Sequence, residues 1–334
     1  MLYYGVIKRR FSNDFHMHDT IKIPSDSGEQ IEAQAPIIIS ASRRTDIPAF
    51  YAKWFANRLK AGYCLWVNPF NNHPMHVAFK KVKAVVFWSK NPKPLIPYLH
   101  ELDERGIHYY FQFTLNDYEE EQFESHVPAI EERIETFKYL SDTIGKEKVI
   151  WRFDPLVMTD KLGIHELLRK VENIGNTLQA YTEKLVFSFA DIGNMYKKVE
   201  NNFKRLKIHY QEFTPQAKNE FATGLCDLNK AWHFSLAACA EHIDLEQYGI
   251  ERNRCIDGEL MKRIFAKDTE FVYYLSTGRL PDKNPALLVE IPNTKINLKD
   301  KGQRGTCGCM VSKDIGMYNT CPHFCVYCYA NSST

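Results

Sequence analysis

The sequence lacks a long apolar run. No stretch approaches the ~20 consecutive apolar residues that a helix needs to cross a bilayer. The first residues, MLYYGVIKRRFSND, contain no apolar segment followed by a small-residue cleavage site. We therefore expect a cytoplasmic protein that neither spans a membrane nor is exported.

An excess of charge of one sign is also missing. The 334 residues carry 43 Lys and Arg against 41 Asp and Glu, so bulk electrostatics give no argument for a nucleic-acid partner. The phosphate-binding pattern Gly-x-x-x-x-Gly-Lys and the nucleophile elbow Gly-x-Ser-x-Gly are both absent. The composition leaves the partner open, and we expect a small-molecule substrate or one of unknown class.

Short runs of β-branched and aromatic residues alternate with amphipathic stretches. Six of these runs predict buried strands, at 36–42, 84–89, 108–115, 149–153, 184–189 and 232–238. Apolar residues at helical spacing predict helices between strands, for instance from Ile130 to Ile144 and from Ile164 to Ile174. This alternation predicts an α/β fold with a parallel sheet. We expect a (β/α) barrel or partial barrel of the TIM type, with an open doubly wound sheet as the alternative.

The sequence shows no internal repeat, low-complexity tract or long linker between large domains. We divide the chain into an N-terminal extension (1–35), a barrel domain (36–300) and a cysteine-rich iron-sulfur segment packed on the barrel (301–334). Residues 63–79 predict an inserted hairpin that turns around two asparagines.

Polar residues follow nearly every predicted strand. In parallel α/β proteins the carboxyl ends of the strands form the ligand-binding face. Arginines at such a face favour an anionic ligand such as a carboxylate or phosphate. The alternative for any single position is that the residue caps the next helix or starts a loop. The candidate residues at this face are Arg43, Arg44, Asp46, Thr114, Asn116, Arg152, Asp154 and Ser188.

The nine cysteines are an odd number, and five of them lie between residues 307 and 328. Without signs of export, a disulfide framework is not expected, and thiolates that hold a metal fit better. Cys321, Cys325 and Cys328 are spaced so that one loop can wrap around a single centre. Tetrahedral zinc sites usually take four protein ligands. Three thiolates on a cubane iron-sulfur cluster leave one iron free to bind a small chelating molecule.

The string CPHFCVYCYA resembles the Cys-x-x-x-Cys-x-aromatic-Cys motif of radical S-adenosylmethionine enzymes, with Tyr327 at the aromatic position. The resemblance implies a 4Fe-4S cluster whose open iron chelates S-adenosylmethionine. It also implies reductive cleavage to a 5′-deoxyadenosyl radical, with an electron from a flavodoxin or ferredoxin. The cofactor carries this chemistry, and the protein orients and shields it. The pair Arg152 and Asp154 is the catalytic candidate.

In most members of that superfamily the motif follows the first barrel strand, whereas here it follows residues 310–319. A circular permutation accounts for this position if a strand before the motif pairs beside residues 36–42. The Gly-Gly-Glu segment that holds the methionine amino group is not visible, so the SRRTD stretch, with Arg43, Arg44 and Asp46, would take its place. Thr114, Asn116, Arg152 and Ser188 are further cofactor-binding candidates.

Nearly the whole chain closely resembles a bacterial family defined as a domain of unknown function, DUF1848, whose cysteine-rich C-terminus has been likened to the radical S-adenosylmethionine cluster. The resemblance rests on SRRTDIP, FWSKNP, FTLNDY, WRFDP, SFAD and DIGMYNTCPHFCVYCYA.

Four other cysteines predict a second centre. Cys307 and Cys309 form a Cys-x-Cys pair, and Cys239 and Cys255 follow the last of the six predicted strands. We expect these four thiolates to hold a second, fully ligated iron-sulfur cluster. The alternative is that Cys239 and Cys255 are small buried hydrophobic residues.

Two other functions stay open. A non-enzymatic barrel with structural zinc would use the same cysteines. A nucleic-acid repair or modification enzyme is the other, because WRFDP is faintly similar to a stretch of spore photoproduct lyases.

Overall fold

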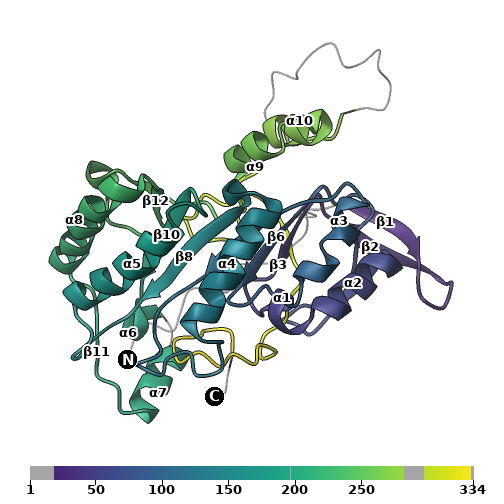
Figure 1. The fold of residues 1–334 in the computed structure, drawn as a ribbon. Coiled ribbons are helices and arrows are strands. Elements are labelled where there is room, and N and C mark those ends of the chain that lie inside the picture. Colours follow the sequence, from purple (N-terminus) through teal and green to yellow (C-terminus); the bar gives the residue numbers. More distant parts are fainter. Residues whose placement is uncertain (1–18, 196, 282–296, 332–334) are drawn as a thin grey trace.

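A large parallel sheet organises the fold (Figure 1). The computed structural model describes residues 19–195, 197–281 and 297–331. The eight strands lie in the order β13-β12-β10-β8-β7-β6-β3-β14, and each neighbouring pair is parallel. Their bounds are β3 Ile38–Ala41, β6 Ala84–Ser89, β7 His108–Thr114, β8 Val149–Leu156, β10 Lys184–Phe189, β12 Ser235–Ala238, β13 Ile250–Arg252 and β14 Lys313–Asp314.

The prediction of a parallel α/β sheet is confirmed, and all six predicted strands are present. A closed barrel is not formed by the described strands, so that form of the prediction is wrong. The two edge strands, β13 and β14, contain three and two residues, and they offer few backbone groups for closure. Two helices, α9 (Gly258–Ile264) and α10 (Thr269–Thr277), instead pack on the face that a barrel would enclose.

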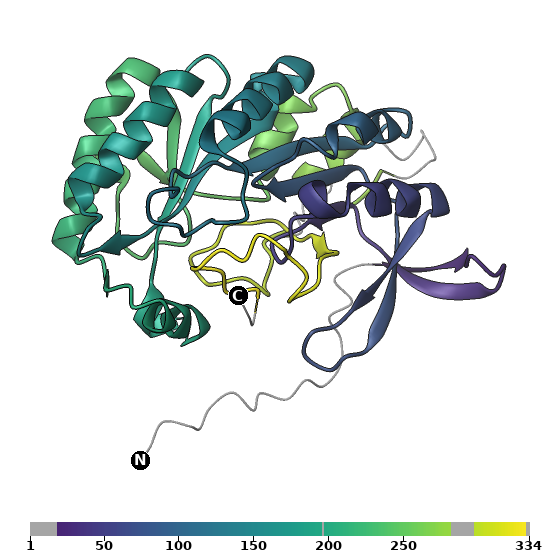
Figure 2. The same ribbon diagram turned by 60° about the horizontal axis from the view of Figure 1, so that its bottom comes forward.

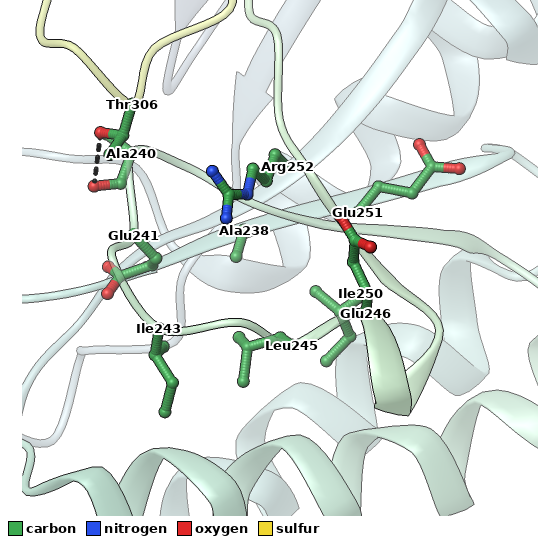
Figure 3. A pocket seen from close by; sticks show the side chains of 10 residues that line it. All are labelled: Ala238, Ala240, Glu241, Ile243, Leu245, Glu246, Ile250, Glu251, Arg252 and Thr306. Atoms are coloured by element: carbon green, nitrogen blue, oxygen red, sulfur yellow. Dashed lines mark hydrogen bonds between the residues drawn. The ribbon is translucent and has the colours of Figure 1, made fainter.

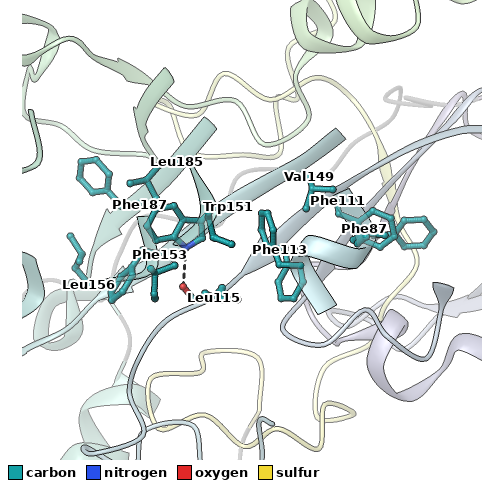
Figure 4. Packing of buried hydrophobic residues seen from close by; sticks show 14 of the residues in the cluster. Phe87, Phe111, Phe113, Leu115, Val149, Trp151, Phe153, Leu156, Leu185 and Phe187 are labelled. Atoms are coloured by element: carbon teal, nitrogen blue, oxygen red, sulfur yellow. Dashed lines mark hydrogen bonds between the residues drawn. The ribbon is translucent and has the colours of Figure 1, made fainter. Parts of the chain in front are cut away.

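The first face of the sheet carries the larger core. It is covered by α2 (Ala52–Ala61), α4 (Ile130–Ile144), α5 (Ile164–Leu178) and α8 (Pro215–Trp232). Large side chains from the central strands fill this layer, and the indole nitrogen of Trp151 donates to the Leu115 carbonyl at 2.9 Å (Figure 4). Hence the buried indole N–H keeps a partner within an otherwise apolar layer.

The second face of the sheet, which α9 and α10 cover, changes character along the strands. Successive residues of a strand point to opposite faces, so alternate residues form one row. On β8 the row begins with Ile150, which belongs to the apolar cluster of this face, and continues with Arg152 and Asp154. On β10 it runs from Val186 to Ser188. The second face is therefore apolar at the amino ends of these strands and polar at their carboxyl ends.

A smaller sheet lies beside the large one, with the order β1-β2-β5-β4. Strands β4 (Tyr63–Val67) and β5 (Pro74–Ala78) form the predicted antiparallel hairpin. Strands β1 (Asp19–Pro24) and β2 (Gln30–Ala35) form a second hairpin in the predicted N-terminal extension, whose residues 1–18 lie outside the described residues.

The remaining elements are short. They are α1 Ile47–Phe50, α3 His100–Asp103, α6 Ile192–Met195, α7 Lys197–Arg205, the paired strands β9 Met158–Thr159 and β11 Tyr210–Gln211, and 3-10 turns at Ile96–Tyr98, Lys146–Lys148 and Glu246–Tyr248. Within the described ranges, we find no helix whose length and apolar character would suit a bilayer.

Candidate functional site at the carboxyl edge of the sheet

The C-terminal segment crosses the carboxyl edge of the large sheet, as the yellow ribbon in Figure 2 shows. It enters through β14, which pairs in parallel with β3, so that Lys313 lies opposite Ile39 and Asp314 opposite Ser40. The sequence predicts a strand before the cysteine motif that pairs beside residues 36–42, and β14 is that strand. The pairing places the residues that follow β14 on the same edge as those that follow β3.

Asp314 fixes the loop after β3. Its carboxylate accepts hydrogen bonds from Ser40 Oγ at 2.7 Å, Ser42 Oγ at 2.8 Å and the Arg43 backbone N–H at 2.9 Å. The Gly316 backbone N–H donates to it at 3.0 Å. One carboxylate thus holds both the SRRTD stretch and the turn that leads into the cysteines.

Gly316 lies so close to Ser42 that the strand junction has no room for a methyl group. A Cβ on Gly316 would stand 1.9 Å from Ser42 Oγ, whereas a Cβ on Gly305 would meet no atom within 4 Å. We expect Gly316→Ala to lower the free energy of unfolding by about 1–3 kcal/mol, because the loop must move. Gly305→Ala is the matched control and should stay within about 1 kcal/mol of the wild type. Equal urea midpoints for the two variants would refute the tight junction.

Residues 319–331, the cysteine loop, close on themselves. The Asn319 backbone N–H donates to the Ala330 carbonyl at 3.0 Å, and Asn331 Nδ2 donates to the Cys321 carbonyl at 2.6 Å. Within the loop, the Cys328 backbone N–H donates to the Cys325 carbonyl at 3.0 Å. Cys321, Cys325 and Cys328, the cysteine trio, therefore belong to one compact ring.

His323 ties this ring to the loop after β3. It is 2% exposed, and its Nε2 lies 2.9 Å from Asp46 Oδ2 while its Nδ1 lies 3.2 Å from the His126 carbonyl. Asp46 also accepts from Ser89 Oγ at 2.7 Å. The hydroxyl of Tyr51 donates to the Thr320 carbonyl at 2.5 Å. Asp46 is thus a positioning residue for the cysteine loop.

Tyr327 ties the ring to the central strands. Its hydroxyl donates to Glu124 Oε1 and accepts from Asn116 Nδ2 at 3.0 Å and from Lys90 Nζ at 2.8 Å. Lys90 Nζ also contacts Glu124 Oε1 at 2.7 Å, and Arg133 Nη1 contacts Glu124 Oε2 at 3.3 Å. The aromatic residue of the cysteine motif is therefore held by a buried network of charged groups.

The surroundings of Cys321 and Cys325 keep these two thiols protonated when no metal is bound. Burial and the nearby Asp46 carboxylate raise the pKa of the Cys321 thiol to about 11. Burial also raises the pKa of Cys325, and the positive charge of Lys90 opposes this shift. A metal that binds these sulfurs must displace their protons.

The polar end of the second face contains a chain of side-chain contacts. Ser188 Oγ donates to Asp154, which in turn forms an ion pair with Arg152. Arg152 Nη1 donates to Gln112 Oε1 at 3.0 Å and to Cys255 Sγ at 3.3 Å. Arg152, Asp154 and Ser188 are thus brought together as the strand-end pattern predicts.

The other predicted residues lie nearby but have different contacts. Thr114 stands opposite Arg152 in the strand register and is half-buried. Arg43 stacks over the ring of Trp88 with 5.0 Å to the ring centroid. Arg44 turns to the outer edge of the sheet, where it contacts Asp314 at 3.4 Å.

The predicted second set of ligands also converges. Cys239, Cys255, Cys307 and Cys309, the cysteine quartet, meet on the second face, where Cys239 Sγ and Cys255 Sγ are 3.6 Å apart. Hydrogen bonds from the Cys239 and Cys309 thiols, together with the charge of Arg152, lower the pKa of Cys255. The remaining two cysteines, Cys64 in β4 and Cys226 in α8, lie in other elements.

As the side chains stand, no three or more His, Cys, Asp or Glu residues in the described ranges form a group that could hold a metal ion. The donor set nevertheless fits an iron-sulfur cluster. All three trio sulfurs come from one closed ring, and the cation of Lys90 lies close enough to Cys325 to alter its pKa. Thiolates are the soft ligands that such clusters take.

A pocket beside the quartet is too small for a substrate. It lies between Ala240, Arg252 and Thr306, and its volume of about 10 Å³ corresponds to one water molecule (Figure 3). Thr306 Oγ1 donates to the Ala240 carbonyl at 3.3 Å across one side of it. At this pocket, a hydrogen bond therefore joins the loop after β12 to the segment that carries Cys307.

Four residues of the site escape sequence reasoning. Glu124 follows the acidic run 119–121, which has the appearance of a solvated helix surface. Lys90, Asp314 and His323 lie within the quoted motifs, but the sequence does not indicate which residues they contact. Only the fold brings each of them to a group that is distant in sequence.

Comparisons with known proteins give little about activity. No curated protein matches the chain. Among solved structures, a putative α-L-fucosidase from Bacteroides thetaiotaomicron is similar with 9% identity and a TM-score of 0.23, over 55% of this chain and 71% of that chain. A similarity this low carries no argument. In contrast, the family model described as "Domain of unknown function (DUF1848)" matches residues 38–330. The chain therefore belongs to the DUF1848 family.

Proposed function

We propose that this protein is an iron-sulfur enzyme of the radical S-adenosylmethionine type, in which Cys321, Cys325 and Cys328 hold a 4Fe-4S cluster. The observation that carries the proposal is the position of the cysteine loop. It closes on itself through Asn319 and Ala330, and it packs on the carboxyl edge of a parallel sheet. That edge is where parallel α/β proteins bind their ligands.

When bound, a cluster with three thiolate ligands offers one open iron to S-adenosylmethionine and supplies the electron that cleaves it to methionine and a 5′-deoxyadenosyl radical. The electron comes from a flavodoxin- or ferredoxin-type reductant. The cofactor determines this chemistry, so the residues of the chain serve to hold, orient and shield.

Lys90 and Tyr327 orient the loop in this proposal. Burial alone would lower the pKa of the Lys90 ammonium, but the Glu124 carboxylate outweighs it and raises that pKa, so the cation persists. A buried cation near Cys325 offsets the negative charge of bound thiolates. The Tyr327 ring packs edge-on against Tyr118 at 6.0 Å between centroids, which fixes the direction of the loop.

The polar row of the second face supplies the ligand-facing groups. Ser188, Asp154 and Arg152 hold one another in place, so their orientation is set before a ligand arrives. We assign Arg152 and Asp154 the contact with substrate, and Thr114 and Ser188 the contact with S-adenosylmethionine. Asp46 and Asn116 act indirectly because their side chains hold the cysteine loop.

Anaerobic reconstitution of Cys325→Ala tests the proposal. The wild type should contain about four irons and four sulfides at the trio, a visible absorption shoulder, and a reduced-state paramagnetic signal that S-adenosylmethionine alters. With dithionite it should release methionine and 5′-deoxyadenosine. We expect Cys325→Ala to lose these irons and both products, because a cluster cannot be held by two thiolates of the loop.

The matched control is Cys226→Ala, which removes a half-buried thiol from α8 and should keep the wild-type iron content. A colourless wild-type protein that binds zinc at the trio would disprove the radical function and support the structural-zinc alternative. So would an iron signal that S-adenosylmethionine leaves unchanged.

A further inference from the structure

The cysteine quartet gathers four thiols from three separate segments. Cys239 follows β12, Cys255 lies between β13 and α9, and Cys307 and Cys309 precede β14. Cys239 Sγ and Cys255 Sγ are 3.6 Å apart, and the Cys255 backbone N–H donates to Cys309 Sγ at 3.2 Å. A chain of sulfur contacts thus crosses the second face.

Backbone contacts fix this convergence. The Cys239 N–H donates to the Phe187 carbonyl at 2.8 Å, and the Met310 N–H donates to the Ile256 carbonyl at 3.1 Å. Gly308, between the two cysteines of the Cys-x-Cys pair, approaches Arg254 so closely that a Cβ would lie 2.9 Å from its side chain. Backbone hydrogen bonds and a close backbone approach therefore fix the positions of the segments that carry these sulfurs.

Cationic and amide donors point at the quartet. Arg152 Nη1 and Asn253 Nδ2 both donate to Cys255 Sγ, at 3.3 and 3.2 Å. Arg43 Nη2 is buried and has no hydrogen-bond partner among the described residues. A buried guanidinium nitrogen without an acceptor is costly. The Arg43 guanidinium interacts electrostatically with Cys309 and Cys255, so it lies near the quartet. Negative charge on the quartet would offset this cost, whereas four neutral thiols would not.

Simple packing and a disulfide explain these contacts less well. Cysteines that act only as small buried hydrophobic residues do not account for a guanidinium donor or for contacts between their sulfur atoms. At 3.6 Å, Cys239 and Cys255 are far from the ~2.05 Å of a disulfide bond. Four thiolates around a divalent zinc, or around a cluster, carry net negative charge and satisfy the donors that surround them.

We propose that Cys239, Cys255, Cys307 and Cys309 form a second metal centre that is ligated by four thiolates and enclosed by the second face and α9. Its chemistry is that of a soft metal, either a single zinc or iron, or iron with sulfide. Binding releases the thiol protons and requires the side chains to turn from their present sulfur contacts about χ1. With all ligand positions supplied by protein, this centre transfers electrons or stabilises the fold and does not bind substrate. The proposal does not depend on the proposed function of the trio.

The full-length chain with all three trio cysteines replaced by alanine isolates the quartet. We would reconstitute it anaerobically with Zn²⁺ alone or with Fe²⁺ and sulfide, and measure metal and sulfide per chain. We expect about one zinc or iron, or about four irons with four sulfides, to remain bound. Adding Cys255→Ser or Cys307→Ser should remove that metal, whereas adding Cys226→Ser should not. Cys307 is half-buried, so its variant tests the site with less risk to folding than Cys255.

Titration with Co²⁺ gives an independent readout. The triple variant should develop the near-ultraviolet sulfur-to-cobalt band, and the quartet variants should lose it while they keep the wild-type circular dichroism. A folded triple variant that binds no metal would overturn the proposal, as would a Cys239–Cys255 disulfide found by alkylation and mass spectrometry. If trio substitutions leave the metal content unchanged while quartet substitutions abolish it, the quartet centre stands and the proposed radical function falls.

Discussion

Glu124→Gln is expected to lower the free energy of unfolding by about 3–5 kcal/mol, the cost of breaking a buried ion pair from one side. Only 3% of the Glu124 side chain is exposed, and it faces Lys90 at 2.7 Å and Arg133 at 3.3 Å. Glutamine keeps the shape of the side chain but removes its charge, so both cations stay buried without compensation. The network that holds Tyr327 should loosen with it.

Urea unfolding measures this effect, with Glu135→Gln as the matched control. Glu135 pairs with Lys138 at the surface, where its side chain is 75% exposed, and exposed pairs contribute about 0–1 kcal/mol. A Glu124→Gln loss no larger than that of Glu135→Gln would contradict the role of the buried network.

The stabilities of the wild type and of Glu124→Gln should respond differently to acid. Burial acts to raise the pKa of Glu124, but Lys90 and Arg133 outweigh it and lower the pKa below its ordinary value of 4.5. A folded-state pKa below the unfolded-state pKa gives stability that is fully present above the unfolded-state pKa and is lost as the pH falls through the folded-state pKa. The difference between wild type and Glu124→Gln should therefore shrink in acid. A difference that stays constant down to full acid unfolding would show that the carboxylate charge is irrelevant.

Asp314→Ala should have an effect of similar size, about 3–5 kcal/mol, because charge-assisted hydrogen bonds contribute ~1.5–3 kcal/mol each and do not add fully. Ser40, Ser42, Arg43 and Gly316 would all lose their acceptor. We also expect faster proteolysis of the cysteine loop, since β14 is only two residues long and relies on this carboxylate.

Asp244→Ala is the control for that variant. Asp244 accepts a single hydrogen bond from the Glu246 backbone N–H at the surface, so its loss should cost about 1 kcal/mol or less. An Asp314→Ala protein with the stability and digestion pattern of Asp244→Ala would show that the loop is anchored elsewhere.

The helices and central strands could be predicted from the sequence because the periodicity of their apolar residues is visible within a short stretch of chain. The β-branched and aromatic run VIWRF predicts β8, and the apolar spacing from Ile130 to Ile144 matches the bounds of α4. The strand-end pattern also groups Arg152, Asp154 and Ser188, which contact one another at the carboxyl ends of β8 and β10. These features depend only on neighbours in the chain and on the geometry of parallel strands.

Other features depend on contacts that no local pattern contains. Helices α9 and α10 fill the face where a barrel would close, and nothing in their sequence indicates this position. Glu124 sits in an acidic stretch that looks solvated, yet its partners Lys90 and Arg133 come from other elements. Long-range charge pairing of this kind becomes visible only in three dimensions.

The pairing of β14 with β3 has a consequence for biosynthesis. Ser40 and Asp314 are 274 positions apart, so at ~5–20 residues per second a ribosome needs roughly 15–55 s to deliver the partner of β3. During that time the outer backbone of β3 is an unprotected template for other nascent chains. Cys321, Cys325 and Cys328 emerge still later, so the loop that carries them is made after the other strands of the sheet. Under the proposed function, a cell short of iron would therefore accumulate folded but unloaded protein rather than unfolded chains.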